Sequence, residues 1–346
     1  MGTKIKRRPR RGVARRAALA VEPLEPRDAP AGGVTQYFLS GPGGPITAGA
    51  PFGVMVRAVD SSGVTVPFYT GTIHFTSSDP KALLPPDYTF TLADAGQHVF
   101  GATLATAGPQ AITGTDTTPV GIRGTLAGPV RPAPANHFLV TGFATGTAGT
   151  SQTFTVTAQD PFGNTDTTYL GTILFFSSAP DNDLPAPYTF LAGDVGQATF
   201  TGQINTSGVQ SVITVDAVNS TIQGAQTGII INPGPTSGFR VYAPEGVGEG
   251  ESAGVTVVAV DDYENPTLNY LGRVHFSSTD PLAVLPADYS YTPVERGKHL
   301  FPGVVFQTGG PQVITVTDAS SPSVTGNTLV YVSGPSDVQL AVFPKE

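Results

Sequence analysis

The sequence contains no cysteine and no tryptophan in 346 residues. Without cysteine there is no disulfide, no thiol nucleophile and no cysteine-based zinc site. This absence does not exclude export, because a sandwich of roughly 100 residues can bury enough surface to fold without disulfides. The sequence also lacks any apolar run near the ~20 residues that a membrane-spanning helix needs. Direct membrane insertion is therefore not expected.

The common catalytic motifs are absent as well. We find no GxSxG elbow, no HExxH pair, no P-loop and no glycine-rich dinucleotide turn. Paired acids for glycoside chemistry need no local motif and could be present among the 26 carboxylates. In the repeats described below, however, no copy has an extra segment, absent from the other copies, that could hold an active site of its own. We therefore predict no catalytic residues and no enzymatic activity.

Charge is distributed unevenly along the chain. Residues 1–31 hold nine Lys/Arg and three Asp/Glu, whereas the remainder holds nine basic and 23 acidic residues. A body this acidic repels nucleic acid and anionic lipid, so neither is an expected partner. The basic segment stands where a targeting signal would, although its apolar part, Ala17–Val21, is too short for an ordinary signal peptide.

Residues 1–33 are accordingly predicted to be a disordered basic export or targeting segment. Its end, VEPLEPRDAPA (Val21–Ala31), resembles the N-terminal tag of many large secreted planctomycete proteins, with an Arg-rich lead, a Leu-Glu-x-Arg core and a Pro-Ala end. That resemblance implies secretion to the cell exterior. A basic tail without any targeting role is the alternative.

From Val34 onward, five landmarks recur three times in the same order about 100 residues apart. They are a turn-opening aspartate, a Tyr-x-Gly hinge, a second tyrosine, a Gly-Gln/Lys segment ending in phenylalanine, and a strand ending in aspartate. The turn aspartates are Asp60, Asp160 and Asp261, and the hinge tyrosines are Tyr69, Tyr169 and Tyr270. A fixed period of this length indicates a tandem array of one structural unit.

Within each copy the hydrophobic period is two. Phe154, Val156 and Ala158 alternate with polar residues and are predicted to face inward, while Thr155, Thr157 and Gln159 face water. Several short strands per copy, separated by Gly, Pro, Asn and Asp, are typical of a two-sheet Greek-key sandwich. We predict an all-β fold of three tandem immunoglobulin-like Greek-key β-sandwiches.

The predicted boundaries are 34–130, 135–232 and 236–333 for repeats 1 to 3. Residues 334–346 match the opening of repeat 3 and are predicted to be the first strand of an incomplete fourth repeat. The joints, Gly128–His137 and Asn232–Gly238, contain proline, which stiffens a linker. We therefore expect a semi-rigid rod.

The repeats resemble bacterial Ig-like modules of the invasin type. The resemblance is carried by the turn AQDPFGN (Ala158–Asn164), the strand pattern YxGTxxFxSS and the segment YTFLAGDVGQATF (Tyr188–Phe200), and it spans residues 34–333. It implies a structural or adhesive extracellular role without a shared catalytic site. In repeat 3, Glu295 stands where the other repeats have aspartate, so any chemistry tied to that acid is in doubt there.

Calcium is the first candidate ligand. Oxygen-bearing side chains cluster in the turns, and calcium takes six to eight oxygen ligands. The candidate residues are Asp160, Asn164, Asp166, Asp261, Asp262 and Glu264, with Asp181, Asn182 and Asp183 as a further group. None of these groups has EF-hand spacing, and Asp and Asn in turns also bond their own backbone. A structural turn role is therefore the alternative interpretation.

Histidine is the second candidate. His74 and His98 in repeat 1 recur as His275 and His299 in repeat 3, but repeat 2 lacks both. A zinc site would need further ligands that the sequence does not supply. Because the two positions change together, we predict that the two rings pack or hydrogen-bond with each other.

Taken together, these features predict a non-enzymatic, secreted or cell-surface array that serves as a spacer or adhesive element and has no cofactor. Its partner would be a protein or glycan at the cell surface. One alternative is a set of calcium-dependent carbohydrate- or ligand-binding modules, which exposed loop aromatics such as Phe162, Tyr263 or Tyr69 would favour. Another is a fragment of a larger secreted multidomain protein.

Overall fold

The structure, a computed structural model, describes residues 1–3, 33–118 and 121–334. Strands dominate these residues, and the two helices found in them are short 3-10 turns, η1 (Leu92–Asp94) and η2 (Ala192–Asp194). No helix in the described part of the chain is long and apolar enough to cross a membrane. The predicted export tag and almost all of the predicted fourth-repeat strand lie outside the described residues.

Module 1 consists of two facing sheets. One sheet has the order β1-β3-β6, and the other has the order β2-β8-β7-β4-β5. The strands are β1 (Gln36–Ser40), β2 (Ile46–Thr47), β3 (Pro51–Val59), β4 (Thr72–Ser77), β5 (Tyr88–Thr89), β6 (Gln97–Thr103), β7 (Gly108–Asp116) and β8 (Arg123–Arg131).

Module 2 repeats this plan with one added short strand. Its sheets have the orders β9-β11-β15-β13 and β10-β17-β16-β12-β14. The strands are β9 (His137–Thr141), β10 (Gly146–Thr147), β11 (Ser151–Gln159), β12 (Thr172–Ser177), β13 (Asn182–Asp183), β14 (Tyr188–Thr189), β15 (Gln197–Ile204), β16 (Gly208–Asp216) and β17 (Gln223–Asn232).

Module 3 has the same strand neighbours, but a single parallel pair, Gly238 with Thr325, joins its two sheets into one. The strands are β18 (Gly238–Tyr242), β19 (Gly246–Gly248), β20 (Ser252–Val260), β21 (Arg273–Ser278), β22 (Tyr289–Ser290), β23 (Lys298–Val305), β24 (Gly310–Asp318) and β25 (Thr325–Ser333). The predicted all-β fold of three tandem Ig-like sandwiches is confirmed.

Alternation along the strands places the core. On β11, Phe154, Val156 and Ala158 are buried as predicted, and Phe154 pairs in register with Phe200 of β15. Thr157 differs from the prediction, because it is 5% exposed and not solvent-facing. Its hydroxyl accepts a hydrogen bond from Gln197 Nε2 at 3.0 Å, which satisfies the buried oxygen.

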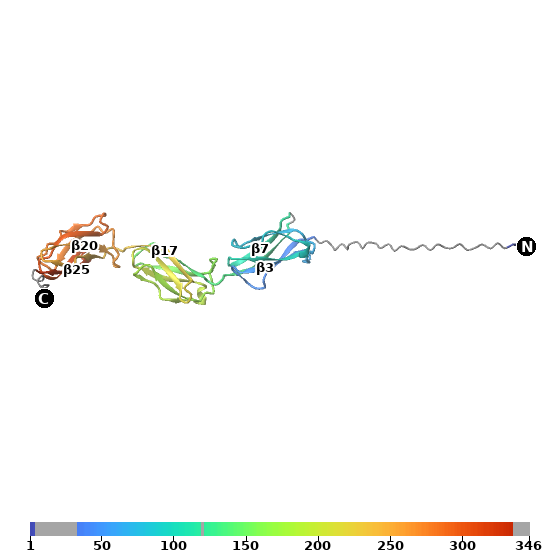
Figure 1. The fold of residues 1–346 in the computed structure, drawn as a ribbon, viewed down its shortest axis with the longest axis horizontal. Coiled ribbons are helices and arrows are strands. Elements are labelled where there is room, and N and C mark those ends of the chain that lie inside the picture. The colour runs from blue at the N-terminus through green and yellow to red at the C-terminus, as the bar shows by residue number, and fades with distance from the viewer. Residues whose placement is uncertain (4–32, 119–120, 335–346) are drawn as a thin grey trace, which may run out of the picture.

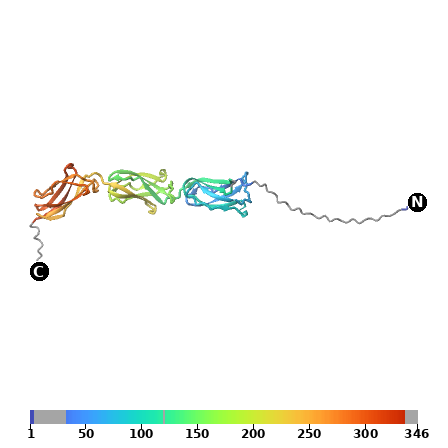
Figure 2. The same ribbon diagram turned by 90° about the horizontal axis from the view of Figure 1, so that it is seen from above.

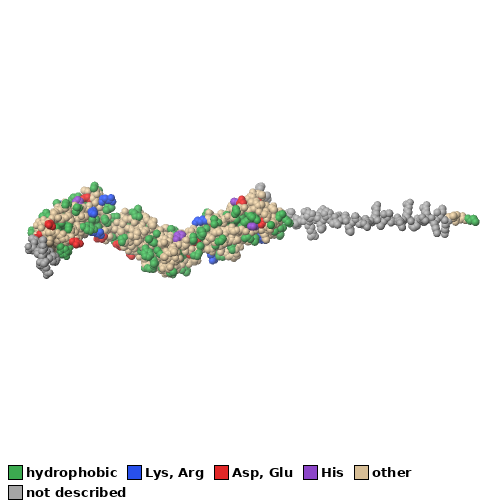
Figure 3. Space-filling model, in the orientation of Figure 1, with side chains coloured by type: hydrophobic (Ala, Val, Ile, Leu, Met, Phe, Trp, Pro, Cys, Tyr) green, Lys and Arg blue, Asp and Glu red, His purple; other side chains and the backbone are tan. Residues whose placement is uncertain are grey.

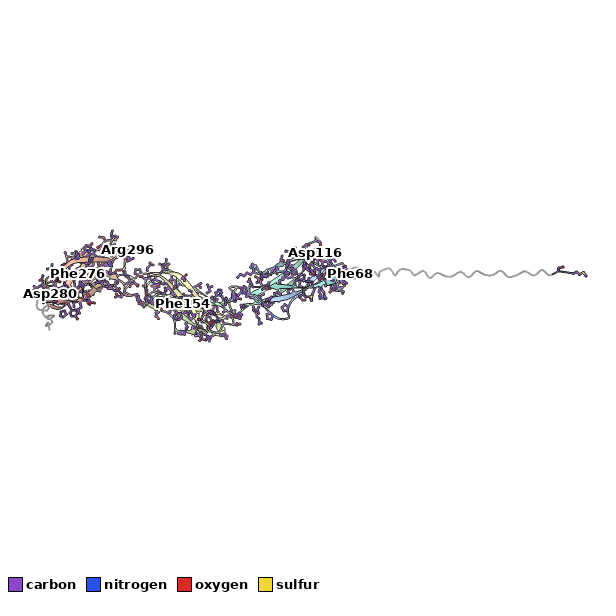
Figure 4. All side chains as sticks on the ribbon, viewed as in Figure 1. Phe68, Asp116, Phe154, Phe276, Asp280 and Arg296 are labelled. Carbon is purple, nitrogen blue, oxygen red and sulfur yellow. The ribbon has the colours of Figure 1, made fainter. Side chains whose placement is uncertain are left out.

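Aromatic rings fill the space between the two sheets of each module. Phe154 stacks on Phe143 with ring centroids 4.8 Å apart and meets Phe175 edge-on at 5.6 Å. In module 3, Phe276 meets Phe301 edge-on at 4.6 Å. Figure 4 labels Phe154 within the second module and Phe276 within the third, so each sandwich has its own core.

The Tyr-x-Gly hinge and the strand-ending aspartate form one structural unit. The Tyr169 hydroxyl donates to the Asp216 carboxylate across the module, and Tyr270 donates to Asp318 at 2.6 Å. A Cβ on Gly171 would come closer than 3.0 Å to both the tyrosine hydroxyl and the aspartate oxygen. Glycine is therefore required beside the tyrosine because a side chain would separate the bonded pair.

The three modules follow one another in a line in both perpendicular views (Figures 1 and 2). The connections are shorter than the prediction of Gly128–His137 and Asn232–Gly238. Strand β8 continues through Arg131 and β9 begins at His137, and β17 ends at Asn232 before β18 begins at Gly238. The first linker thus has five residues, 132–136, because the residues before it already pair with β7.

Candidate functional site

The turn between the third and fourth strands of each module opens on one of the predicted turn aspartates, and in modules 2 and 3 it lies at the boundary with the preceding module. In module 2 this turn is Asp160–Asn164, and in module 3 it is Asp261–Asn265. Each turn contacts the module that precedes it. We call the turn residue with an aromatic ring, Phe162 or Tyr263, the plug, and the surface it meets the receiver.

Asp160 shapes the first of these turns. Its side chain is fully buried, and Oδ1 accepts the backbone N–H groups of Phe162 at 2.9 Å and Asn164 at 2.8 Å. Oδ2 accepts the N–H of Ala133 in the linker at 3.0 Å. One carboxylate therefore holds the turn closed and ties the linker to it.

Asn164 reaches across the boundary into module 1. Its Nδ2 donates to the carbonyl oxygen of Ala105 at 2.7 Å, and its Oδ1 accepts the N–H of Ala107 at 2.9 Å. The side-chain amide of Asn164 thus donates to one backbone carbonyl and accepts from one backbone N–H, as a residue of a neighbouring β-strand would. Leaving a buried group such as the Ala105 carbonyl unpaired costs about 1–3 kcal/mol, so the half-buried Asn164 amide clamps the two modules together.

Phe162, the plug, packs against the hydrophobic core of module 1. Its ring lies over Gly49, where a Cβ would come within 3.0 Å of the ring carbons. Gly49 has φ of +77°, a conformation that residues with side chains rarely adopt. Lys81 adds a bond from its Nζ to the Phe162 carbonyl at 2.5 Å.

The second joint uses the same parts. Asp261 Oδ1 accepts the N–H groups of Tyr263 and Asn265, both at 2.9 Å, and Oδ2 accepts the linker N–H of Gly234 at 2.7 Å. Tyr263 packs against the core of module 2 over Gly149, and Gln203 Nε2 donates to its hydroxyl at 3.3 Å.

Asn265 clamps this joint as Asn164 clamps the first. Its Nδ2 donates to the Asn205 carbonyl and its Oδ1 accepts the Ser207 N–H, both at 2.7 Å. Asn205 and Ser207 occupy the receiver positions that Ala105 and Ala107 hold in module 1. Two joints with different side chains on the receiver thus make the same backbone contacts.

Module 1 carries the same turn without the parts that dock. Asp60 Oδ1 accepts the N–H groups of Ser62 at 2.9 Å and Val64 at 3.0 Å, as in the other modules. Ser62 replaces the aromatic plug and Val64, 62% exposed, replaces the asparagine. Phe68, a few residues on, is labelled at the outer end of this module in Figure 4.

Electrostatics at the turns match a structural role. Burial by itself would raise the pKa of Asp160, but hydrogen bonds from Asn164, Ala133 and Phe162 outweigh it and lower the pKa below its usual value. The pKa of Asp261 is lowered by the equivalent bonds, again against burial. Each carboxylate is therefore stabilised in its charged form by N–H donors.

The calcium candidates fall into separate environments. Asp160, Asn164 and Asp261 belong to the joints, and Asp166 accepts the linker N–H of Ala135 at 2.8 Å and the N–H of Thr168 at 3.0 Å. Asp262 is exposed, and Glu264 pairs with Arg240 at 2.6 Å. Within the described residues, no three His, Cys, Asp or Glu side chains gather as a metal site would. Calcium binding stays a prediction.

The group Asp181, Asn182 and Asp183 does not converge on one point. Asp181 Oδ1 accepts from Asn205 Nδ2 at 2.9 Å, which braces the loop carrying the receiver of module 2. Asn182 Nδ2 donates to the carbonyl of Ala179 at 2.7 Å, and Asp183 lies in strand β13.

The histidines have separate partners. His74 bonds Asp87 at 2.6 Å, whereas His98 stacks on Tyr88 with ring centroids 4.3 Å apart and bonds Asp94 at 2.9 Å. The prediction that the two rings contact each other is therefore wrong. In module 3, Glu295 takes the role of Asp94, because it accepts from Tyr289 at 2.7 Å and pairs with His299.

The loop aromatics that would favour a ligand-binding surface have other partners. Phe162 and Tyr263 are the plugs, and Tyr69 donates its hydroxyl to Asp116 inside module 1. On the face drawn in Figure 3, the basic side chains of the modules form small separate groups among uncharged ones.

The receiver could not be predicted from the sequence, since most of its contacts come from backbone atoms. A signal for the joint was nevertheless present. Phe162 with Asn164 and Tyr263 with Asn265 occur in the two repeats that follow another repeat, whereas repeat 1 has Ser62 and Val64. Turn residues that change with position in an array point to contacts between its units.

No protein-family description matches this sequence, and no curated protein matches it. Solved structures that are similar include FdeC, an adhesin of Escherichia coli (15% identity over 86% of this chain and 96% of that one, TM-score 0.36). InvD of Yersinia pseudotuberculosis is similar at 16% identity over 86% and 98% (TM-score 0.34). Invasin, described as a bacterial integrin-binding protein, is similar at 14% over 87% and 60% (TM-score 0.32). These likenesses concern the fold and carry no information on activity.

Proposed function

We propose that this chain is a non-enzymatic extracellular spacer, a stiff array of Ig-like modules that carries or forms an adhesive surface at the cell exterior. The observation that supports it is the joint, which is built twice from the same plug, clamp and linker contacts. A hinge between modules would need none of these bonds. A spacer that holds a surface at a set distance needs all of them.

The module surfaces suit contact with a protein or glycan partner. Rows of threonine line the outer strand faces, with Thr172 and Thr189 hydroxyls 2.7 Å apart and Thr155 and Thr199 hydroxyls 3.2 Å apart. Hydroxyl rows of this kind offer both donors and acceptors. The acidic composition argues against nucleic acid as a partner. The basic N-terminal segment is proposed to direct export.

Limited proteolysis of intact producing cells tests the location. We expect protease added outside the cells to remove the protein while a cytoplasmic marker stays whole. Protection of the chain until the cells are lysed would contradict the proposed location.

An adhesion assay tests the role. Cells that produce the chain with Phe162→Ala and Tyr263→Ala should attach to their substratum less well than wild-type cells, because loosened joints no longer hold the array extended. Cells with Ser62→Ala, a change at the same turn position in module 1, should attach normally. Equal attachment by a strain without the gene would contradict the adhesive role.

A further inference from the structure

The outer end of module 3 repeats the receiver that modules 1 and 2 use to hold the next module. Gly250 has φ of +77°, matching +77° at Gly49 and +79° at Gly149. Its N–H donates to the Phe306 carbonyl at 2.9 Å, as the Gly49 N–H donates to Leu104 at 2.8 Å. The glycine over which a plug would lie is therefore already in the docking conformation.

The backbone groups of this receiver are also in place. In module 1, Asp79 Oδ2 accepts the N–H groups of Ala105 at 2.6 Å and Thr106 at 2.9 Å, which fixes the loop that Asn164 grips. In module 3, Asp280 Oδ2 accepts Gln307 at 2.6 Å and Thr308 at 3.0 Å. Figure 4 labels Asp280 at the outer end of the third module. The carbonyl of Gln307 and the N–H of Gly309 thus correspond to the pair that the clamp uses.

Two features distinguish this receiver from the occupied ones. Apart from Gly250 itself and its two chain neighbours, no described residue has an atom within 4 Å of a Cβ built on Gly250, whereas Gly49 and Gly149 are covered by an aromatic ring. The Gly309 N–H, which would bond the amide oxygen of a clamp, donates instead to Glu249 Oε1 at 2.7 Å. Glu249 stands where modules 1 and 2 have the buried Ala48 and Ala148.

We propose that the outer end of module 3 is a docking surface for the Asp-x-aromatic-x-Asn turn of a further Ig-like module, with Glu249 satisfying the Gly309 N–H until the turn displaces it. The occupant is argued from this chain, since the same surface binds that turn at both joints. Module 1 of a second copy does not fit, because Ser62 and Val64 replace plug and clamp. This inference rests on the joints and not on the proposed surface role, so either can fail alone.

An extended chain tests the proposal. Residues 132–232, the first linker and module 2, are repeated directly after Ser333, so that a second copy of the Asp160–Asn164 turn faces the receiver of module 3. The matched control carries Phe162→Ser and Asn164→Val in the added copy alone, which are the residues of module 1. Calorimetry is used to check that the added module folds in both chains. If the added module 2 does not fold, a repeated module 3 (residues 233–333) is added in its place.

Hydrogen exchange of the Gly309 amide is the readout. We expect exchange at least tenfold slower with the Phe/Asn turn than with the Ser/Val turn. Glu249→Ala should speed Gly309 exchange in the native chain and have little effect in the Phe/Asn chain, because the asparagine then accepts the bond. Equal exchange with the two added turns, or equal sensitivity to Glu249→Ala in the native and Phe/Asn chains, overturns the proposal.

Discussion

Each module contains a tyrosine hydroxyl that donates to a carboxylate across the sandwich. Burial raises the pKa of Tyr69, Tyr169 and Tyr270, and the bonded Asp116, Asp216 and Asp318 raise it further. The Asp116 and Asp216 pKa values are lowered because hydrogen bonds from these tyrosines and nearby groups outweigh burial. In modules 1 and 2 both partners therefore favour a neutral tyrosine facing a charged aspartate.

This arrangement predicts loss of stability in alkali. In the unfolded chain a tyrosine titrates near pH 10.0, whereas the folded pKa is higher. The contribution of the pair is thus fully present below pH 10 and is lost as pH rises through the interval between the two values. We expect the melting temperature to fall above pH 10, as measured by calorimetry. Tyr169→Phe should lessen the fall for module 2, and an unchanged fall in that variant would contradict this account.

Asp79 predicts the behaviour in acid. Burial opposes its charge, but bonds from Thr106, Lys81 and Ala105 outweigh burial and lower the pKa to about 2, from 3.8 in the unfolded chain. A depressed pKa contributes stability above pH 3.8 that is lost as pH falls toward 2. Wild-type melting temperature should therefore drop between pH 4 and pH 2. Asp79→Asn should reduce that dependence for module 1, and a melting temperature that stays constant in wild type over this range would contradict it.

The turn aspartates also lead to a prediction about calcium. The oxygens of Asp160 and Asp261 already accept hydrogen bonds from N–H donors, so a cation at either carboxylate would compete with these bonds. A ligand that binds the folded state raises the melting temperature by mass action. We expect millimolar calcium followed by chelator to leave the melting temperature unchanged. A reversible rise would reinstate the calcium-dependent modules as the better interpretation.

At the scale of the element, the joint depends on a glycine that leaves room for a ring. Gly149 and Gly250 share nearly the same positive φ, but Gly149 alone of this pair lies beneath an aromatic side chain. Alanine in the left-handed region costs roughly 1–2 kcal/mol whatever surrounds it. A comparison of the two sites therefore separates backbone strain from blocked docking.

We expect Gly149→Ala and Gly250→Ala to lower the stability of their own modules by similar amounts. Gly149→Ala alone should also displace Tyr263, because its Cβ would overlap the ring. Tyrosine fluorescence and exchange of the Ser207 amide would report that displacement. If Ser207 exchange is the same in both variants, the ring does not depend on the glycine.

At the scale of the whole molecule, two short linkers and two docked turns keep the modules in line (Figures 1 and 2). Five-residue linkers limit how far neighbours can separate, but they do not set an angle. The plug and clamp set it, since they fix three points of contact between one module and the next.

Removal of both plugs should therefore convert the rod into a jointed chain. In small-angle scattering, Phe162→Ala with Tyr263→Ala should broaden the distribution of particle lengths, while circular dichroism reports an unchanged strand content. Ser62→Ala is the control, because among the described residues Ser62 makes no contact like those of the two plugs. An identical length distribution for the double variant would show that the linkers alone set the shape.

Much of this architecture could be predicted from local patterns. The two-residue alternation around Phe154 is a local property and predicted the strands. The recurrence of Tyr169, Gly171 and Asp216 with a fixed period predicted the hinges and the number of modules. The burial of Thr157 could not be predicted in this way, because it depends on Gln197 from another strand. The separate partners of His74 and His98 could not be predicted either, because they also come from other segments of the chain.

By itself, the sequence determined the fold class, the number of repeats and the turns at Asp160 and Asp261, because periodicity and turn chemistry are local properties. Tertiary structure alone decided that Phe162 lies over Gly49 of the neighbouring module and that Asn164 bonds the backbone of Ala105 and Ala107. Their partners are largely backbone groups brought close by folding, and backbone groups have no signature in a sequence. For the same reason, the receiver at Gly250 could not be predicted from the sequence.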